Sequence, residues 1–220
     1  MMDRLSPQIA ARPPRRRPAE GLEARILSAR AILILGAFLS LVPSGCSFLS
    51  SKPSRFYSLA RIQPQAAMTS VRGLPIGIDV VLPPGVDRKE VVVRQSDHGL
   101  EVRGREQWTA TLQPLVLHTL ASDLADRLPE GMVILPGQAK PDGGQRSIDV
   151  LFEELAPGPD RAVVLDARWT LSQPGLAAVS HYEHITVAIA SFDSANIATG
   201  MSQGLATLAD RMVAQLSVNR

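Results

Sequence analysis

The apolar residues of this chain follow two periods, one typical of strands and one typical of helices. In the segment 76–82, apolar side chains return at every second position, which predicts a strand with one strongly apolar face. Asp97 and Gly99 suit a tight turn between two apolar runs, so a β-hairpin is predicted around them. Strands are predicted at residues 56–59, 76–82, 90–94, 100–103, 133–135, 148–152, 163–171 and 179–190.

A first helix is predicted over residues 112–128, where apolar residues recur at spacings of three and four. Thr109 or Thr111 can cap its start with a side-chain oxygen. Pro114 is compatible only with the first turn, and Pro129 marks the end, because proline lacks the N–H that a helix interior requires. The segment should therefore present one apolar stripe to a neighbouring layer.

A second helix is predicted over residues 197–216, with Asp193 or Ser194 as its cap. Strands, a helix, further strands and a closing helix indicate an α/β fold. We expect a single domain over residues 55–220, with a mixed β-sheet packed by two main helices. Trp108 and Trp169 are expected to anchor its core.

The start of the chain has the pattern of an export signal. Ala31–Val42 is an uncharged, apolar run behind Arg25 and Arg30, and it is too short to span a bilayer as a helix. Residues 1–45 are therefore predicted to form a signal peptide that ends in a lipobox-like site.

Cys46 follows small residues and is the only cysteine in the chain, so it is the predicted site of lipidation. The position three residues earlier is Pro43, where a lipobox usually has an aliphatic residue. Residues 46–54 are small, polar and interrupted by proline, which suits a lipidated tether. Ser47 after the cysteine predicts sorting to the outer membrane.

The net charge of the whole chain, +2, does not describe the mature domain, because the basic residues are concentrated near the start of the chain. Residues 1–45 hold seven of the 23 basic residues and three of the 21 acidic residues, which leaves 16 basic and 18 acidic residues in the mature chain. That domain has no overall basic field for phosphates, and aromatic residues are only 4% of the sequence. A nucleic-acid partner is not expected.

No catalytic or metal-ligating constellation is predicted, and no cofactor is expected. His181 and His184 are three residues apart on a predicted strand, so their rings should point to opposite faces. Glu153 and Glu154 should also face apart, which makes them poor as an acid and base pair. The sequence contains no Gly-x-Ser-x-Gly motif and no Gly-x-x-x-x-Gly-Lys-Ser/Thr motif.

Several short motifs occur in a defined order: a lipidation-type Cys, Tyr-x-Leu, Leu-Pro before Asp-Arg, a Val-rich strand closing on Arg, and Trp before a Leu-rich helix. The residues are Cys46, Tyr57, Leu59, Leu82, Pro83, Asp87, Arg88, Val91, Val92, Val93, Arg94, Trp108, Leu120, Ala121, Leu124 and the closing helix at Leu205–Ala209. This order resembles the PqiC-type auxiliary lipoproteins of ABC transport systems. The resemblance covers most of the mature chain.

The resemblance implies an outer-membrane lipoprotein that faces the periplasm and works with an MCE-domain protein, a permease and an ATPase in lipid transport, supporting envelope integrity. It implies a docking or assembly component rather than an enzyme or motor. The candidate partner-contact or family-motif residues are Pro83, Asp87, Arg88, Arg94 and Trp108. Asp87 and Arg88 are either a partner-contact pair or a turn-stabilising ion pair, and a homo-oligomer is left open.

Two other classes of function remain as alternatives. One is a lipid-tethered periplasmic enzyme, which turnover of an envelope substrate would reveal. The other is a binding lipoprotein for wall synthesis or lipopolysaccharide assembly, which co-purification with a synthase would indicate.

Overall fold

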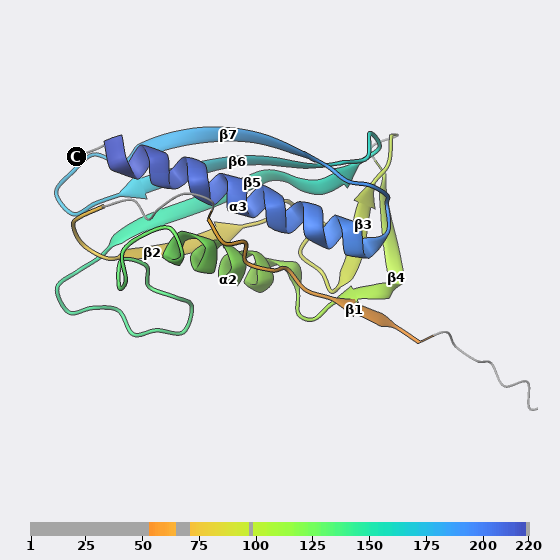
Figure 1. Ribbon diagram of the computed structural model, residues 1–220, viewed down its shortest axis with the longest axis horizontal. Helices are drawn as coiled ribbons and strands as arrows, with labels where there is room; N and C mark the ends of the chain where they lie inside the picture. The colour runs from red at the N-terminus through yellow and green to blue at the C-terminus, as the bar shows by residue number, and fades with distance from the viewer. Residues whose placement is uncertain (1–52, 65–70, 97–98, 219–220) are drawn as a thin grey trace, which may run out of the picture. The chain divides into compact units, whose positions relative to one another are not determined.

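The strands of the chain pair into two small mixed sheets (Figure 1). The computed structural model describes residues 53–64, 71–96 and 99–218. Cys46, the predicted signal peptide and most of the predicted tether lie outside these described residues. The two sheets and two helices confirm the α/β class that the apolar periods predict.

The larger sheet contains β2 (Ile76–Val81), β5 (Arg146–Gly158), β6 (Ala162–Ser172) and β7 (Val179–Ala188), in the order β2-β5-β6-β7. β2 pairs with β5 in parallel, and the other neighbours are antiparallel. Along β6, buried side chains alternate with more exposed ones, as a strand with one covered face requires. Helices cover that face.

The smaller sheet has the order β1-β4-β3, with β1 (Arg55–Tyr57), β4 (Leu100–Trp108) and β3 (Glu90–Arg94). β3 and β4 form the predicted hairpin. β4 runs further than predicted because its last residues, which lack an alternating pattern, pair in parallel with β1. The chain therefore enters the described domain through a strand.

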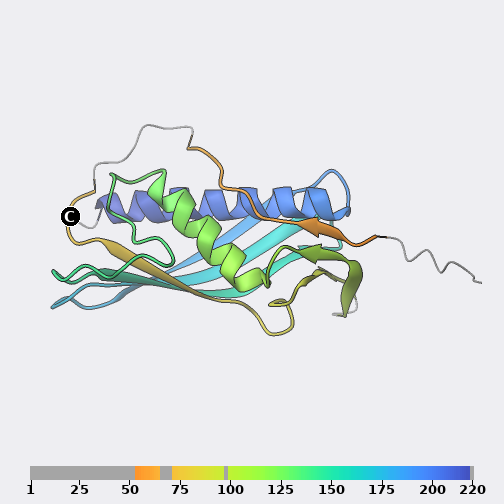
Figure 2. The ribbon, with the colours of Figure 1, turned by 90° about the horizontal axis from the view of Figure 1, so that it is seen from below.

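The helices α2 (Leu112–Ala125) and α3 (Ser194–Val218) lie on the same face of the four-stranded sheet (Figure 2). α3 crosses the sheet closely at Gly200. A Cβ atom there would lie 2.6 Å from Ile189 Cγ2 and 2.9 Å from Val163 Cγ2, so the approach requires glycine. The predicted helical stripe of α3 is confirmed, because its apolar positions are buried.

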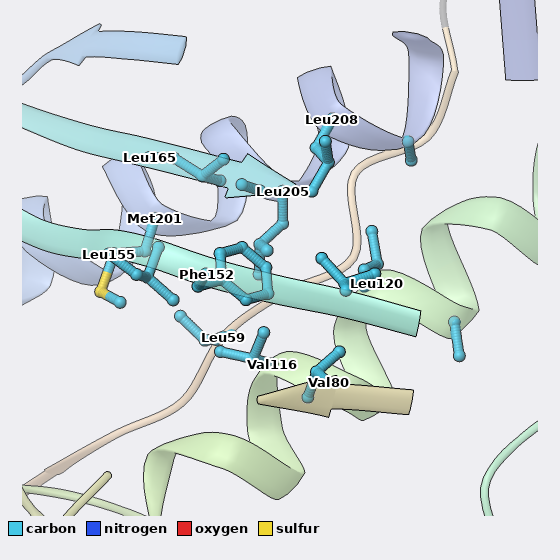
Figure 3. Packing of buried hydrophobic residues seen from close by; sticks show 14 of the residues in the cluster. Leu59, Val80, Val116, Leu120, Phe152, Leu155, Leu165, Met201, Leu205 and Leu208 are labelled. Carbon is cyan, nitrogen blue, oxygen red and sulfur yellow. The ribbon is translucent and has the colours of Figure 1, made fainter. Parts of the chain in front are cut away.

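The core lies between the helices and the sheet (Figure 3). Both tryptophans are buried, as expected. The labelled core residues come from the segment after β1, from both helices and from three strands: Leu59, Val80, Val116, Leu120, Phe152, Leu155, Leu165, Met201, Leu205 and Leu208.

Two local predictions were wrong. Residues 133–135 do not form a strand: Val133 makes a single bridge to Ile76, and Pro136 and Gly137 follow in a turn. Neither proposed threonine caps α2 with its side chain: Thr111 occupies the N-cap position without a side-chain hydrogen bond. By contrast, the predicted Asp193 cap of α3 is confirmed, since its Oδ1 accepts the N–H of residue 196 at 2.9 Å.

Candidate functional site

The connection between β2 and β3 carries three of the candidate residues, Pro83, Asp87 and Arg88. Asp87 Oδ1 accepts a hydrogen bond from the backbone N–H of Gln113 at 2.9 Å. Asp87 thus supplies the cap of α2 from a distant part of the chain, satisfying an N–H of the first turn. Arg88 Nε pairs with Glu90 Oε2 at 3.3 Å. Asp87 and Arg88 thus have different partners, in place of the turn-stabilising ion pair that was one of the two alternatives.

Pro83 and Trp108 also have structural contacts in this region. The Pro83 carbonyl accepts the Val86 N–H at 3.3 Å and closes a turn. The backbone N–H of Trp108 donates to the Lys89 carbonyl at 2.6 Å, while the indole is buried. Pro83 therefore closes a turn within the β2–β3 connection, and Trp108 holds the end of this connection against β4.

Arg94 lies apart from this junction and links the two sheets. Its Nε donates to Glu154 Oε1 at 2.7 Å, joining β3 to β5. β5 shifts register between Phe152 and Glu154, and the neighbouring Glu153 pairs with Arg168 instead. The two glutamates therefore have different partners.

Among the three charged candidates, Arg88 is the one whose side-chain contact stays local in sequence. Its side chain is 44% exposed, and its ion pair with Glu90 is local in sequence. The structure therefore separates Arg88 from Asp87, Arg94 and Trp108, whose contacts join different elements of the fold.

A polar network missed in the sequence surrounds residues 58–63, called here the N-terminal strap. The Ala60 N–H donates to Ser202 Oγ of α3 at 3.0 Å, and the Ile62 N–H donates to Asp123 Oδ1 of α2 at 2.8 Å. Arg127 Nη1 donates to the Ile62 carbonyl at 3.2 Å. The strap is thus tied to both helices (Figure 2).

Asp123 is the most deeply buried acid of this network, with 0% exposure. Desolvation raises its pKa to about 6, against the opposing effects of the Ile62 N–H and the Arg127 charge. Arg127 is also buried and donates through Nε to Asp210 Oδ1 at 2.6 Å. The i, i+4 spacing of Asp123 and Arg127 within the predicted helix 112–128 was the signal available in the sequence.

A groove of about 650 Å³ opens beside the strap, between α3 and β7. Its polar groups are amides, hydroxyls and the Arg127–Asp210 pair, which offer hydrogen-bond donors and acceptors of balanced charge. Such a lining suits a polar segment better than an acyl chain. Besides Thr186, whose hydroxyl lies on the opposite face of the sheet, the lining residues with polar side chains are Gln63, Arg127, Gln203, Thr207 and Asp210.

The face of the large sheet opposite the helices carries a second polar arrangement. His184 Nδ1 lies 2.5 Å from Asp166 Oδ1, and His184 Nε2 lies 3.2 Å from Thr186 Oγ1. This order of hydroxyl, imidazole and carboxylate occurs in nucleophilic catalysis, which also needs oxyanion donors in a water-excluded site. His184 is 60% exposed on an open sheet, so the three groups fit a hydrated surface network.

His181 faces the other way from His184. Its ring stacks on Trp169 with centroids 4.2 Å apart, under the helices. The predicted opposite orientation of the two histidines is therefore observed.

Across residues 53–64, 71–96 and 99–218, no group of three or more His, Cys, Asp or Glu side chains is placed to hold a metal ion. Within the same ranges, neither helix is long and apolar enough to span a bilayer.

These features define a class: an α/β domain with a polar groove, an open sheet face and an N-terminal strap. The chain belongs to the family described as the ABC-type transport auxiliary lipoprotein component, whose profile matches residues 57–213. This match confirms the family that the order of motifs indicated. A comparison with curated proteins finds no match.

Solved structures share the fold. One, titled as the crystal structure of an uncharacterized protein, superimposes with a TM-score of 0.62 at 18% identity, covering 76% of this chain and 100% of that one. Another, from Xanthomonas campestris and assigned to the DUF330 family, gives a TM-score of 0.60 at 12% identity, covering 75% and 95%. At these identities the likeness concerns the fold alone.

Proposed function

We propose that this protein is an outer-membrane lipoprotein facing the periplasm and a non-enzymatic auxiliary subunit of an MCE-type ABC lipid transport system that supports envelope integrity. The observation that carries the proposal is the family match over residues 57–213, which spans almost the whole described domain. In this role the domain docks on an MCE-domain protein, while other subunits supply the membrane channel and the ATPase.

The proposed anchor is a diacylglyceryl group on Cys46. The apolar run Ala31–Val42 and the small residues before Cys46 support export followed by lipidation. Each buried CH₂ group of a lipid contributes about 0.8 kcal/mol to membrane binding, far more than the polar tether offers. Ser47 supports outer-membrane sorting.

The test of the anchor is metabolic labelling with a fatty acid. Cys46→Ala should abolish the label and release the protein from membranes. Ser47→Asp is the matched probe of sorting, because it leaves the lipidated residue in place. Labelling that persists in Cys46→Ala would refute the anchor, and native protein found in the inner membrane would refute the proposed location.

The proposed docking surface includes Arg88. The mature chain carries 16 basic and 18 acidic residues, so its overall charge gives little long-range attraction, and a local contact must supply specificity. Arg88 supplies an exposed guanidinium beside a connection held in place by Asp87 and Trp108. A fixed loop costs less ordering on binding than a free one.

The test of docking uses the domain without its lipid and the purified MCE-domain protein. Arg88→Glu should weaken binding, whereas Arg168→Glu is a matched control. Arg168 also pairs with a glutamate at 3.3 Å and is 54% exposed, but it lies on the open sheet face. No binding at about 100 µM, equivalent to about −5.5 kcal/mol, would refute the transport role. Equal effects of both variants would refute only the Arg88 contact.

A further inference from the structure

Phe56 is a large apolar side chain that the fold leaves in water. It is 63% exposed, although it lies in β1, where Tyr57 next to it packs against the core. The register pairs Phe56 with Gln107 of β4, so its backbone is fixed in the sheet. A rigid strand therefore presents an aromatic ring to the surroundings.

The position of Phe56 in the chain limits what can cover it. Ten peptide steps separate Cys46 from Phe56, a reach of at most about 35 Å when fully extended. The turn between β6 and β7, with its exposed Leu176, lies at the opposite end of the large sheet (Figures 1 and 2). β6 alone is 11 residues long, which adds about 36 Å. The β1 end is thus the one that a lipid on Cys46 keeps nearest the bilayer.

The neighbours of Phe56 have the charge that suits an anionic lipid surface. Arg105 lies two residues before Gln107, the cross-strand partner of Phe56, and therefore on the same face of the strands as Phe56. Arg55 is on the other face, opposite Glu106. Both arginines are exposed, and neither forms an ion pair with any described residue. An exposed aromatic ring beside a free cation is the pattern of interfacial membrane contacts.

We propose that Phe56 and Arg105 form a membrane-contact patch, with the Phe56 ring in the interfacial layer of the leaflet that holds the Cys46 lipid. The proposal rests on the lipid anchor of the proposed function. The patch is too small to bind a membrane alone, and it acts because the anchor raises its effective concentration at the surface. It orients the domain with the β6–β7 turn directed away from the bilayer.

The experiment places an environment-sensitive NBD label on the lipidated mature protein. Because lipid occupies the sulfur of Cys46, Phe56→Cys provides the one reactive thiol. Leu176→Cys is the matched control, since Leu176 is 66% exposed and Phe56 is 63% exposed. Each protein is reconstituted into vesicles of phosphatidylethanolamine and phosphatidylglycerol. Emission is recorded with and without nitroxide-bearing phospholipids.

The expected result is blue-shifted emission at position 56 that lipid nitroxides quench, and water-like, unquenched emission at position 176. Arg105→Glu should reduce the shift at position 56. Water-like emission at position 56 in protein that still floats with vesicles would overturn the patch and leave the anchor standing. A blue shift without nitroxide quenching would also overturn it, since a protein contact would then cover Phe56. Mature protein that is isolated from cells without lipid on Cys46 would remove both the anchor and the patch.

Discussion

Replacing the buried carboxylate of Asp123 by an amide tests the account of the polar network. In Asp123→Asn, the retained side-chain oxygen can still accept the Ile62 N–H, which Asp123 Oδ1 accepts at 2.8 Å. The substitution removes a charge that has 0% exposure, while Arg127 keeps its contact with Asp210. The variant therefore isolates the cost of holding an ionised acid in the interior.

The size and sign of the effect follow from the pKa of Asp123, which folding raises from 3.8 to about 6. At 1.36 kcal/mol per pKa unit, this corresponds to about 3 kcal/mol. An acid with a raised pKa binds its proton more tightly in the folded state, so its contribution is fully present below pH 3.8 and is lost as the pH rises to about 6. The stability of Asp123→Asn relative to wild type should therefore increase by up to about 3 kcal/mol across this window.

The assay is chemical denaturation of both proteins at several pH values from about 4 to about 7. The change in their difference matters, because a constant offset also contains the new buried amide N–H groups. The titration of Asp193 falls below this pH range. Its hydrogen bond from Ser191 lowers its pKa to about 2, so its contribution to stability is lost only at lower pH. A difference between the two proteins that stays constant would refute the reasoning.

Asp210→Asn is the control for this experiment. It removes a carboxylate from the same Arg127, but the Asp210 side chain is 60% exposed, where solvent screens charge. We expect a change of less than about 1 kcal/mol. A larger loss would show that Arg127 depends on Asp210 rather than on the buried carboxylate.

Three further predictions concern packing and capping. Asp87→Ala should destabilise the domain by about 1 kcal/mol, because it removes the cap of α2, and urea denaturation measures this. Gly200→Ala should destabilise it by about 1–3 kcal/mol through the close contact with the sheet, whereas Gly204→Ala, with 3.5 Å to its nearest neighbour, should be neutral or stabilising; equal melting temperatures would contradict this. Leu120→Asp should abolish cooperative unfolding, and an unchanged thermal transition would show that the stripe is wrongly assigned.

The sequence predicted the elements whose patterns are local. The closing helix was predicted at 197–216 and runs over Ser194–Val218, because its apolar stripe and its Asp193 cap are both near it in sequence. β5 was predicted only at 148–152, although it continues to Gly158. The register shift after Phe152 breaks the alternation, so the second half of the strand has no period-2 signal.

The contacts of the candidate site depend on residues that are distant in sequence. The cap of α2 comes from Asp87, 26 positions before Gln113, so no local motif could reveal it. The Asp123 partner, Ile62, is 61 positions away. The family motifs indicated the candidate residues near Asp87, but only the contacts in the structure show that Asp87, Arg94 and Trp108 join different elements of the fold.

The attachment of β1 also determines how the domain responds to mechanical load. A force applied through the residues before Arg55 acts first on the three parallel pairs that Arg55–Tyr57 form with β4, and only then on the strap. Tension along the strand loads these pairs together, while tension across it opens them one after another. Detaching β1 alone adds about 10 Å of extended chain. The hydrogen bonds of Ala60 and Ile62 are the next contacts to bear the load, so we expect the helices and the large sheet to stay folded while the reach increases.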